Sequence, residues 1–169
     1  MKVVEDGIEV DLTNADHVYP KHDAKVVDGG EGNTVFGGVD RRFIAAGRCY
    51  WLELSLYRDR PHPKKEGQLL PSLISNGELR RELHRKFFRT AAYLGLTKQL
   101  DDLPITYVAL VEPPVDLDAA LRGALLGELS SLLPRKPKNR PWPHDHKAVV
   151  LDLKAWNENF PQFPASLTP

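Results

Sequence analysis

The sequence predicts an α/β (α+β) fold in which a mixed β-sheet has a central antiparallel hairpin and is flanked by helices. Three observations lead to this prediction. Aromatic and branched residues cluster on both sides of Ala46-Gly47, apolar residues recur at helical spacing in two later segments, and short apolar runs follow each of those segments. Strands that alternate with helices favour a mixed sheet covered by helices.

Length and composition fit a single domain over residues 1–169. A chain of this length can bury most of its apolar surface, and 41% of its residues are hydrophobic and 27% charged. Cys49 is the only cysteine, which excludes an intramolecular disulfide and a multi-cysteine zinc site. No stretch approaches the roughly 20 apolar residues of a membrane span, and the start has acids where a signal peptide needs an apolar run. We therefore expect a cytoplasmic protein with no membrane partner.

The formal charge is balanced, with 23 basic and 23 acidic side chains, which argues against a protein that coats nucleic acid through its global charge. The basic residues nevertheless gather in three clusters, which are either solvated faces or local contacts for phosphate. The clusters are Arg58, Arg60, Lys64 and Lys65; Arg80, Arg81, Arg85, Lys86 and Arg89; and Arg135, Lys136, Lys138 and Arg140.

Residues 1–37 are predicted to be an irregular N-terminal segment. Within it, residues 8–12 alternate apolar and acidic residues and predict a short edge strand. The glycine-rich run at residues 28–33 lacks the lysine and Ser/Thr of a phosphate-binding loop, so we interpret it as a plain loop.

Residues 39–57 carry the strongest β signal, and Ala46-Gly47 is a plausible tight turn between two strands. If that turn contains two residues, counting outward pairs Asp40 with Glu53. A turn of three or five residues would shift the register and separate this pair.

Directly opposed side chains on an antiparallel pair share one face, with Cβ atoms about 5 Å apart. Because side chains alternate along a strand, Ser55 falls on the same face as Asp40 and Glu53. Two facing carboxylates destabilise a hairpin unless a cation, a metal or a proton lies between them. The spacing therefore marks this pair as a candidate site.

The best helix is expected over about residues 76–95. Ser75 and Glu78 fit a capping box, and Gly95 is a natural C-cap. One face carries Leu79, Leu83, Phe87, Ala91 and Leu94, and the opposite face carries Arg81, Arg85 and Arg89.

The rest of the chain predicts a strand, a helix, a strand and a tail. Residues 105–111 are apolar almost throughout and predict a buried strand. Asp116 or Asp118 can cap the next helix, whose apolar face is Leu117, Leu121, Leu125, Leu129 and Leu132. After a basic, proline-rich connection, residues 148–153 predict a final strand, and residues 154–169 a proline- and aromatic-rich C-terminal tail.

The acids and the order of elements over roughly residues 35–112 resemble the PD-(D/E)XK nuclease superfamily, also called restriction-endonuclease-like. In that family an acid opens the second strand of a hairpin, and an E-x-K motif follows on the third. A helix and a buried strand come next. Val39-Asp40 matches the first acid, and Glu53-Leu54-Ser55 occupies the place of E-x-K. The resemblance implies that Asp40 and Glu53 bind Mg²⁺, with Mn²⁺ as a substitute, and that Ser55 stands at the third catalytic position.

The chain departs from this pattern at Ser55, because a serine cannot supply the positive charge of the family's lysine. Either a lysine from another element reaches the site, with Lys64, Lys65 and Lys86 as candidates, or the site binds without cutting. A clear N-terminal helix is also missing, so that Glu31 is the residue left to replace the acid some relatives carry there.

Simpler interpretations of the same residues remain open. Asp40 can pair with Arg42 or Arg58, and Glu53 with Arg41 or Arg48. For the other conspicuous residues the structural interpretation is favoured: Tyr50 and Trp51 as core, Cys49 as core filler, and His144-Asp145-His146 as a solvated loop.

Two functional hypotheses follow. The first is a protein that acts on or binds DNA or RNA, with phosphate contacts from Arg81, Arg85, Arg89, Lys64 and Lys65. The second is a non-catalytic accessory or immunity-type protein on the same scaffold, which forms a homodimer or binds another protein. In that case either the tail or an exposed helix face would bury an apolar patch against the partner; the aromatic residues of the tail are Trp156, Phe160 and Phe163.

Overall fold

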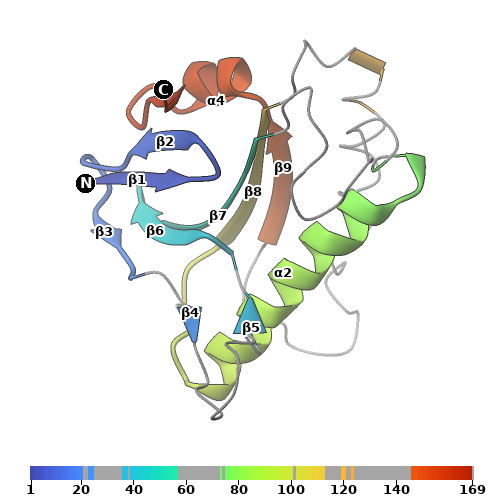
Figure 1. The fold of residues 1–169 in the computed structure, drawn as a ribbon. Coiled ribbons are helices and arrows are strands. Elements are labelled where there is room, and N and C mark those ends of the chain that lie inside the picture. The colour runs from blue at the N-terminus through green and yellow to red at the C-terminus, as the bar shows by residue number, and fades with distance from the viewer. Residues whose placement is uncertain are drawn as a thin grey trace.

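The computed structural model describes residues 1–20, 23–24, 36–37, 39–56, 73, 75–100, 102–112, 119–120, 123 and 146–168. These residues form a mixed α/β fold of three layers (Figure 1). A five-stranded sheet is covered on one face by a long helix and on the other by a three-stranded sheet and a short helix. The predicted α/β class is confirmed at this level.

The large sheet is mixed, and its middle strand is the second strand of the predicted antiparallel hairpin. Its strand order is β3-β6-β7-β8-β9, with β6 and β7 antiparallel and β7, β8 and β9 parallel to one another. The strands are β3 (His17–Val18), β6 (Arg41–Ala45), β7 (Arg48–Leu56), β8 (Ile105–Glu112) and β9 (His146–Leu151). Residues 105–111 of β8 are all buried, as predicted, because both faces of this strand are covered.

The hairpin between β6 and β7 has the two-residue turn predicted from the sequence. Ala45 pairs with Arg48, and both turn residues, Ala46 (φ 48°) and Gly47 (φ 68°), have left-handed backbones. Such turns match the twist of the flanking strands. The carboxylate of Asp16 accepts a hydrogen bond from the Ala46 amide at 3.0 Å and so supports the turn.

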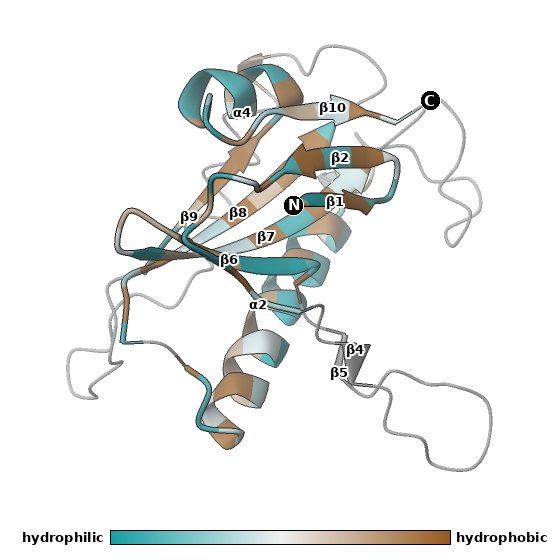
Figure 2. Ribbon diagram, turned by 90° about the vertical axis from the view of Figure 1, so that its left-hand side faces the viewer, coloured by the Kyte–Doolittle hydropathy of each residue, from teal (hydrophilic) through white to brown (hydrophobic). Residues whose placement is uncertain are grey.

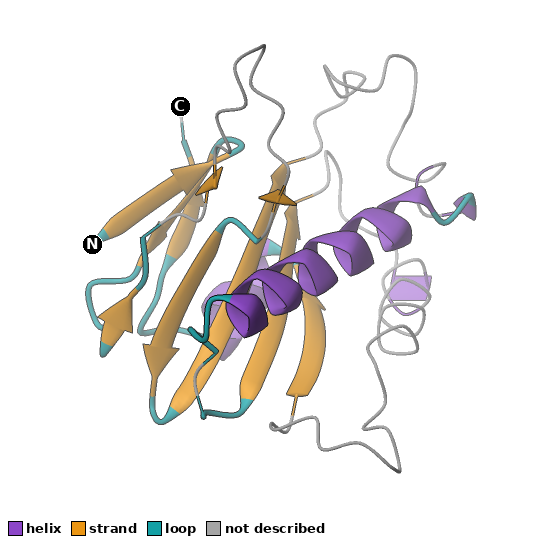
Figure 3. Cartoon of the chain, turned by 90° about the horizontal axis from the view of Figure 1, so that it is seen from below, coloured by secondary structure: helices purple, strands orange, loops and turns teal. Residues whose placement is uncertain are grey.

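Helix α2 (Glu78–Leu96) lies diagonally across one face of the large sheet (Figure 3). The predicted apolar face is buried and packs on side chains from β7 and β8, including Trp51 and Tyr107. This layer forms the first of two cores.

The ends of α2 differ from the prediction. Gly77 is the N-cap, with a left-handed backbone, and the side chain of Asn76 accepts a hydrogen bond from the Glu78 amide at 2.9 Å. The predicted capping box from Ser75 is therefore wrong. At the other end the helix continues past Gly95, and the hydroxyl group of Thr97 donates to the carbonyl of Tyr93 at 2.8 Å.

The beginning of the chain is a regular sheet, which corrects the prediction of an irregular segment. Strands β1 (Lys2–Glu5), β2 (Ile8–Asp11) and β10 (Ala165–Leu167) form an antiparallel sheet in the order β1-β2-β10. The predicted edge strand is thus central. A tight turn at Asp6-Gly7, with φ of 47° and 81°, joins β1 to β2, and the other neighbour comes from the opposite end of the chain.

The predicted C-terminal tail belongs to the second core, between the three-stranded sheet and β6, β7 and β8. Asp152 caps helix α4 (Leu153–Asn159) by accepting from the Ala155 amide at 2.7 Å, which ends β9 at residue 151. Trp156 is fully buried, and its indole donates to the carbonyl of Phe163 at 2.5 Å. Figure 2 shows α4 and β10 above β7 and β8. The expectation that Trp156 and Phe163 pack against a partner is therefore wrong.

Several predictions lie outside the described residues: the cap and the leucine face of the helix after residue 116, the basic connection at residues 134–143, the glycine-rich run, and Glu31. The same holds for Arg58, Lys64, Lys65, His144 and Asp145. A two-stranded pair, β4 (Asp23–Ala24) with β5 (Phe36–Gly37), completes the described strands. Neither α2 nor α4 has the length and apolar character needed to cross a membrane, so the described part of the chain has no helix that could do so.

Candidate functional site

Two acids meet on the face of the large sheet that α2 covers. Arg41 pairs with Leu52, so the next position outward places Asp40 opposite Glu53, as predicted. Asp40 is 9% exposed and Glu53 2%. The Asp40 carboxylate accepts a hydrogen bond from the Leu54 amide at 2.8 Å, which fixes it against β7.

A lysine from α2 completes the cluster. The Nζ atom of Lys86 forms an ion pair with Oε1 of Glu53, and the charge of Lys86 also acts on Asp40. The helix brings it there because Lys86 lies within one turn of Leu83 and Thr90, which both face the sheet. Of the three lysines considered from the sequence, Lys86 therefore reaches the acids; Lys64 and Lys65 are not described.

A threonine joins the helix to the beginning of β6. The Thr90 hydroxyl accepts a hydrogen bond from the Val39 amide at 2.9 Å and donates one to the Lys86 carbonyl at 2.9 Å. Since Val39 directly precedes Asp40, this contact sets the position of the acid relative to the lysine. Thr90 was not predicted as a site residue. A polar residue within the apolar face of the helix is the feature of the sequence that could have indicated it.

Tyr107 lies near the two acids, on the face of the large sheet that α2 covers. It pairs with Trp51 in the β7–β8 register and donates a hydrogen bond to the Leu83 carbonyl at 3.2 Å. Burial raises the pKa of the Tyr107 hydroxyl well above its usual value, and the charges of Glu53 and Asp40 raise it further. The phenol is therefore neutral and acts as a donor. Tyr107 was not predicted as a site residue either, because a tyrosine in an otherwise apolar strand is expected to be part of the core.

Burial dominates the electrostatics of Asp40 and raises its pKa to about 6. The charge of Lys86 and the hydrogen bond from Leu54 act in the opposite direction, whereas Glu5 and Asp6 raise the pKa slightly more. The carboxyl group is therefore far easier to protonate than an ordinary aspartate.

Burial also raises the pKa of Glu53 well above its usual value, and the neighbouring Asp40 adds to this rise. Lys86 offsets part of it. For Lys86 itself, burial lowers the pKa, but the charges of Glu53 and Asp40 outweigh burial and the net shift is upward. Lys86 is therefore a cation at neutral pH, and the two acids compete for it.

The oxygen atoms of this site suit a hard divalent cation. Oε2 of Glu53 is buried and has no hydrogen-bond partner among the described residues, while Oε1 faces Lys86. Two carboxylates satisfy the preference of Mg²⁺ for oxygen, and this ion usually keeps several waters or substrate phosphate oxygens. No group of three or more His, Cys, Asp or Glu side chains in the described part of the chain is placed to hold a metal. Within that part of the chain, Asp40 and Glu53 are a pair of carboxylates, one short of such a group.

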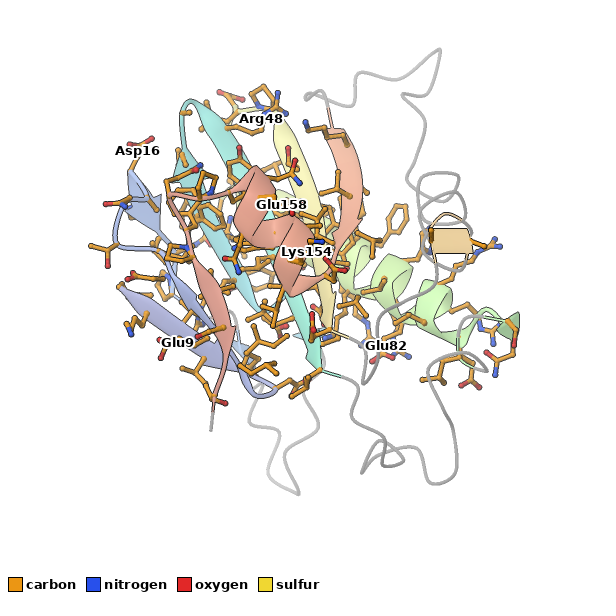
Figure 4. All side chains as sticks on the ribbon, turned by 90° about the horizontal axis from the view of Figure 1, so that it is seen from above. Glu9, Asp16, Arg48, Glu82, Lys154 and Glu158 are labelled. Carbon is orange, nitrogen blue, oxygen red and sulfur yellow. The ribbon has the colours of Figure 1, made fainter. Side chains whose placement is uncertain are left out.

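The remaining predicted site residues lie around this cluster or away from it. Ser55 is partly buried on the same face of β7 as Glu53 and pairs with Val111. Arg81 and Arg85 are exposed on α2, and Arg89 is partly buried. A further acid that the sequence analysis missed, Glu82, projects from α2 (Figure 4), and its charge raises the pKa of Glu53.

Among the described residues, Arg48 and Arg42 make contacts other than the simpler pairings with the acids; Arg58, the other candidate partner of Asp40, lies outside those residues. Arg48 donates to the Thr106 hydroxyl at 3.3 Å, and the guanidinium of Arg42 lies 4.1 Å from the centre of the Tyr19 ring. The ion pair of Glu53 is with Lys86. Tyr50 and Trp51 are packed as predicted: Tyr50 stacks on Phe43 and Trp51 contacts Phe87, with ring centres 4.8 Å and 5.2 Å apart; Cys49 is buried.

Comparisons of the chain with protein-family models, with curated proteins and with solved structures found no match. The fold and the site together define a mixed α/β protein with a buried cluster of two carboxylates and one lysine.

Proposed function

We propose that this chain is a restriction-endonuclease-like protein that hydrolyses phosphodiester bonds in DNA or RNA with the help of Mg²⁺, or of Mn²⁺ as a substitute. The observation that carries the proposal is the ion pair between Lys86 and Glu53 beside Asp40. It places two carboxylates and one cation together although Ser55 occupies the lysine position of the motif.

Each residue has a definite task in this proposal. Asp40 and Glu53 hold the metal, which when bound supplies an activated water and neutralises charge on the phosphate. Lys86 provides the positive charge that stabilises the negative transition state. Thr90 positions Lys86 relative to Asp40, and the neutral Tyr107 lies near the two acids.

The exposed arginines on α2 support a nucleic-acid substrate. Arg81 and Arg85 face solvent on the same helix that carries Lys86. Contacts from arginine to phosphate supply affinity that does not depend on sequence. We propose that this helix lies along the phosphate backbone.

Cleavage of fluorescent DNA and RNA with Mg²⁺, Mn²⁺ or EDTA tests the proposal. Asp40→Asn, Glu53→Gln and Lys86→Met should each reduce the rate by about 100-fold or more. Glu158→Gln and Lys154→Met repeat two of these changes at exposed positions on α4 (Figure 4) and should leave it unchanged. Metal-dependent cleavage that survives all three site variants would overturn the proposal, because a contaminating nuclease would explain it.

One observation favours a second candidate function, a non-catalytic scaffold that binds a protein or a second copy of itself. Glu53 is 2% exposed and already paired with a cation, which also describes an ion cluster with a purely structural role. Under this alternative, neither Mg²⁺ nor Mn²⁺ binds in calorimetric titration. Light scattering would then report a dimer or a captured partner.

A further inference from the structure

We propose that Lys86 is a displaceable internal cation, whose ammonium group neutralises Glu53 until a divalent metal enters and drives it out. This inference rests on the proposed function, because it requires Asp40 and Glu53 to bind metal. It adds an order of events: the metal must bind first, and only then is the lysine free to contact phosphate.

The lysine and a bound metal would need the same carboxylate oxygens. Lys86 is paired with Oε1 of Glu53, and its charge also acts on Asp40. A cation held by both carboxylates would lie within a few Å of the ammonium group. In a partly buried site, repulsion between a divalent and a monovalent cation at about 4 Å lowers the metal affinity by more than tenfold. The two cations therefore exclude each other.

Lys86 is the member of the cluster that can move. Its side chain is 25% exposed, whereas that of Glu53 is 2% exposed. Asp40 is held by the Leu54 amide, and Glu53 lies within β7, between two paired strands. A lysine has a flexible stem of four carbons, and its neighbour Arg85 already faces solvent.

The negative charge of the site also requires a cation beside the two acids. Without Lys86 the two carboxylates would face each other in a buried setting, and Glu5, Asp6 and Glu82 add further negative charge nearby. One ammonium group balances one carboxylate, and a divalent ion balances both. Oε2 of Glu53, which lacks a hydrogen-bond partner among the residues described, is the oxygen that the ammonium group leaves unused.

Calorimetric titration with Mn²⁺ alone tests the exchange, with wild type, Lys86→Met and Lys154→Met compared. Lys86→Met should bind Mn²⁺ at least tenfold more tightly than wild type, although it no longer cleaves. Lys154→Met makes the same change at an exposed position on α4 and should match wild type. If Lys86 instead holds the two acids in place for the metal, its removal should weaken Mn²⁺ binding.

Lys86→Met also strips a buried carboxylate of its counter-ion, so a second measurement uses the wild-type chain. Acetylation by a small reagent, read by mass spectrometry, should be slow at Lys86 without metal and several-fold faster with Mg²⁺. The exposed Lys98 and Lys154 are internal references that should not respond.

The outcomes separate the two proposals. Equal Mn²⁺ affinity in wild type and Lys86→Met, with Lys86 acetylation unchanged by Mg²⁺, would overturn the exchange but leave a metal site in place. Absence of binding in both proteins, with no metal effect on acetylation, would overturn the proposed function and the exchange with it.

Discussion

Thr90 and Val39 lie 51 positions apart in the chain and are joined by a buried hydrogen bond of 2.9 Å from the Val39 amide to the Thr90 hydroxyl. The same hydroxyl donates to the Lys86 carbonyl, so one side chain connects the beginning of β6 to the middle of α2. The relative placement of Asp40 and Lys86 depends on this connection.

Replacing Thr90 with valine should therefore destabilise the fold by about 1–3 kcal/mol, because it leaves the Val39 amide buried without an acceptor. Thr90→Ser keeps the hydroxyl and should recover most of that loss. Urea denaturation of the two variants and the wild type measures the difference. A Thr90→Val protein as stable as Thr90→Ser would show that the hydrogen bond contributes nothing.

The hairpin turn predicts opposite effects at two adjacent positions. Ala46 has φ of 48°, a left-handed backbone that costs an alanine about 1–2 kcal/mol and an asparagine less. Ala46→Asn should thus raise the free energy of unfolding by up to about 1 kcal/mol. Gly47→Ala should lower it by about 1–2 kcal/mol through backbone strain alone, since no atom lies within 4 Å of the added Cβ. Thermal unfolding of both variants gives the two signs, and equal signs would contradict the turn geometry.

Stability should depend on pH through Asp40. Its pKa rises from 3.8 in the unfolded chain to about 6 in the folded protein, so protonation favours the fold. The stabilisation is fully present below pH 3.8 and is lost as the pH rises through about 6, a change of about 3 kcal/mol.

Asp40→Asn should remove the part of the dependence that comes from Asp40, while Glu53, whose pKa is also raised, still titrates; the amide oxygen of the new side chain can still accept from the Leu54 amide. Urea unfolding in EDTA at several values between pH 4 and pH 7 measures the two profiles. Wild type should lose stability relative to the variant across this range. Parallel profiles would mean that Asp40 titrates normally.

Replacing Trp156, which lies in the segment predicted to be a tail, should greatly lower the free energy of unfolding. Trp156→Ala should cost about 3–5 kcal/mol, because it opens a cavity in the second core and removes the hydrogen bond to Phe163. Phe88→Ala is the matched control, since Phe88 is 37% exposed on α2, and it should cost less than about 1 kcal/mol. A small loss for Trp156→Ala would place this residue at an exposed docking surface after all.

The parts of the fold that the sequence predicts are those decided by neighbours in the chain. A two-residue turn sets the β6–β7 register, so the opposition of Asp40 and Glu53 follows from counting outward. The apolar face of α2 and the buried β8 follow from their own periodicity.

The rest depends on contacts between distant segments. Val10 pairs with Ala165, and no local pattern in either segment indicates the other. From the sequence, Lys86 was one of three lysines that could reach the acids. Choosing among them requires knowing where α2 crosses the sheet. The true start of α2 was missed because a glycine backbone and Asn76 replace the expected serine cap.

The pairing of β10 with β2 also has a consequence for the chain during its synthesis. Strand β2 emerges from the ribosome before β10, and the two cannot pair until residues 165–167 have left the exit tunnel. Until then Ile8 and Val10, both fully buried in the finished protein, lack the β10 side of their core. While the residues between β2 and β10 are being made, the edge of β2 that later pairs with β10 is therefore open, and its apolar side chains lack part of their cover.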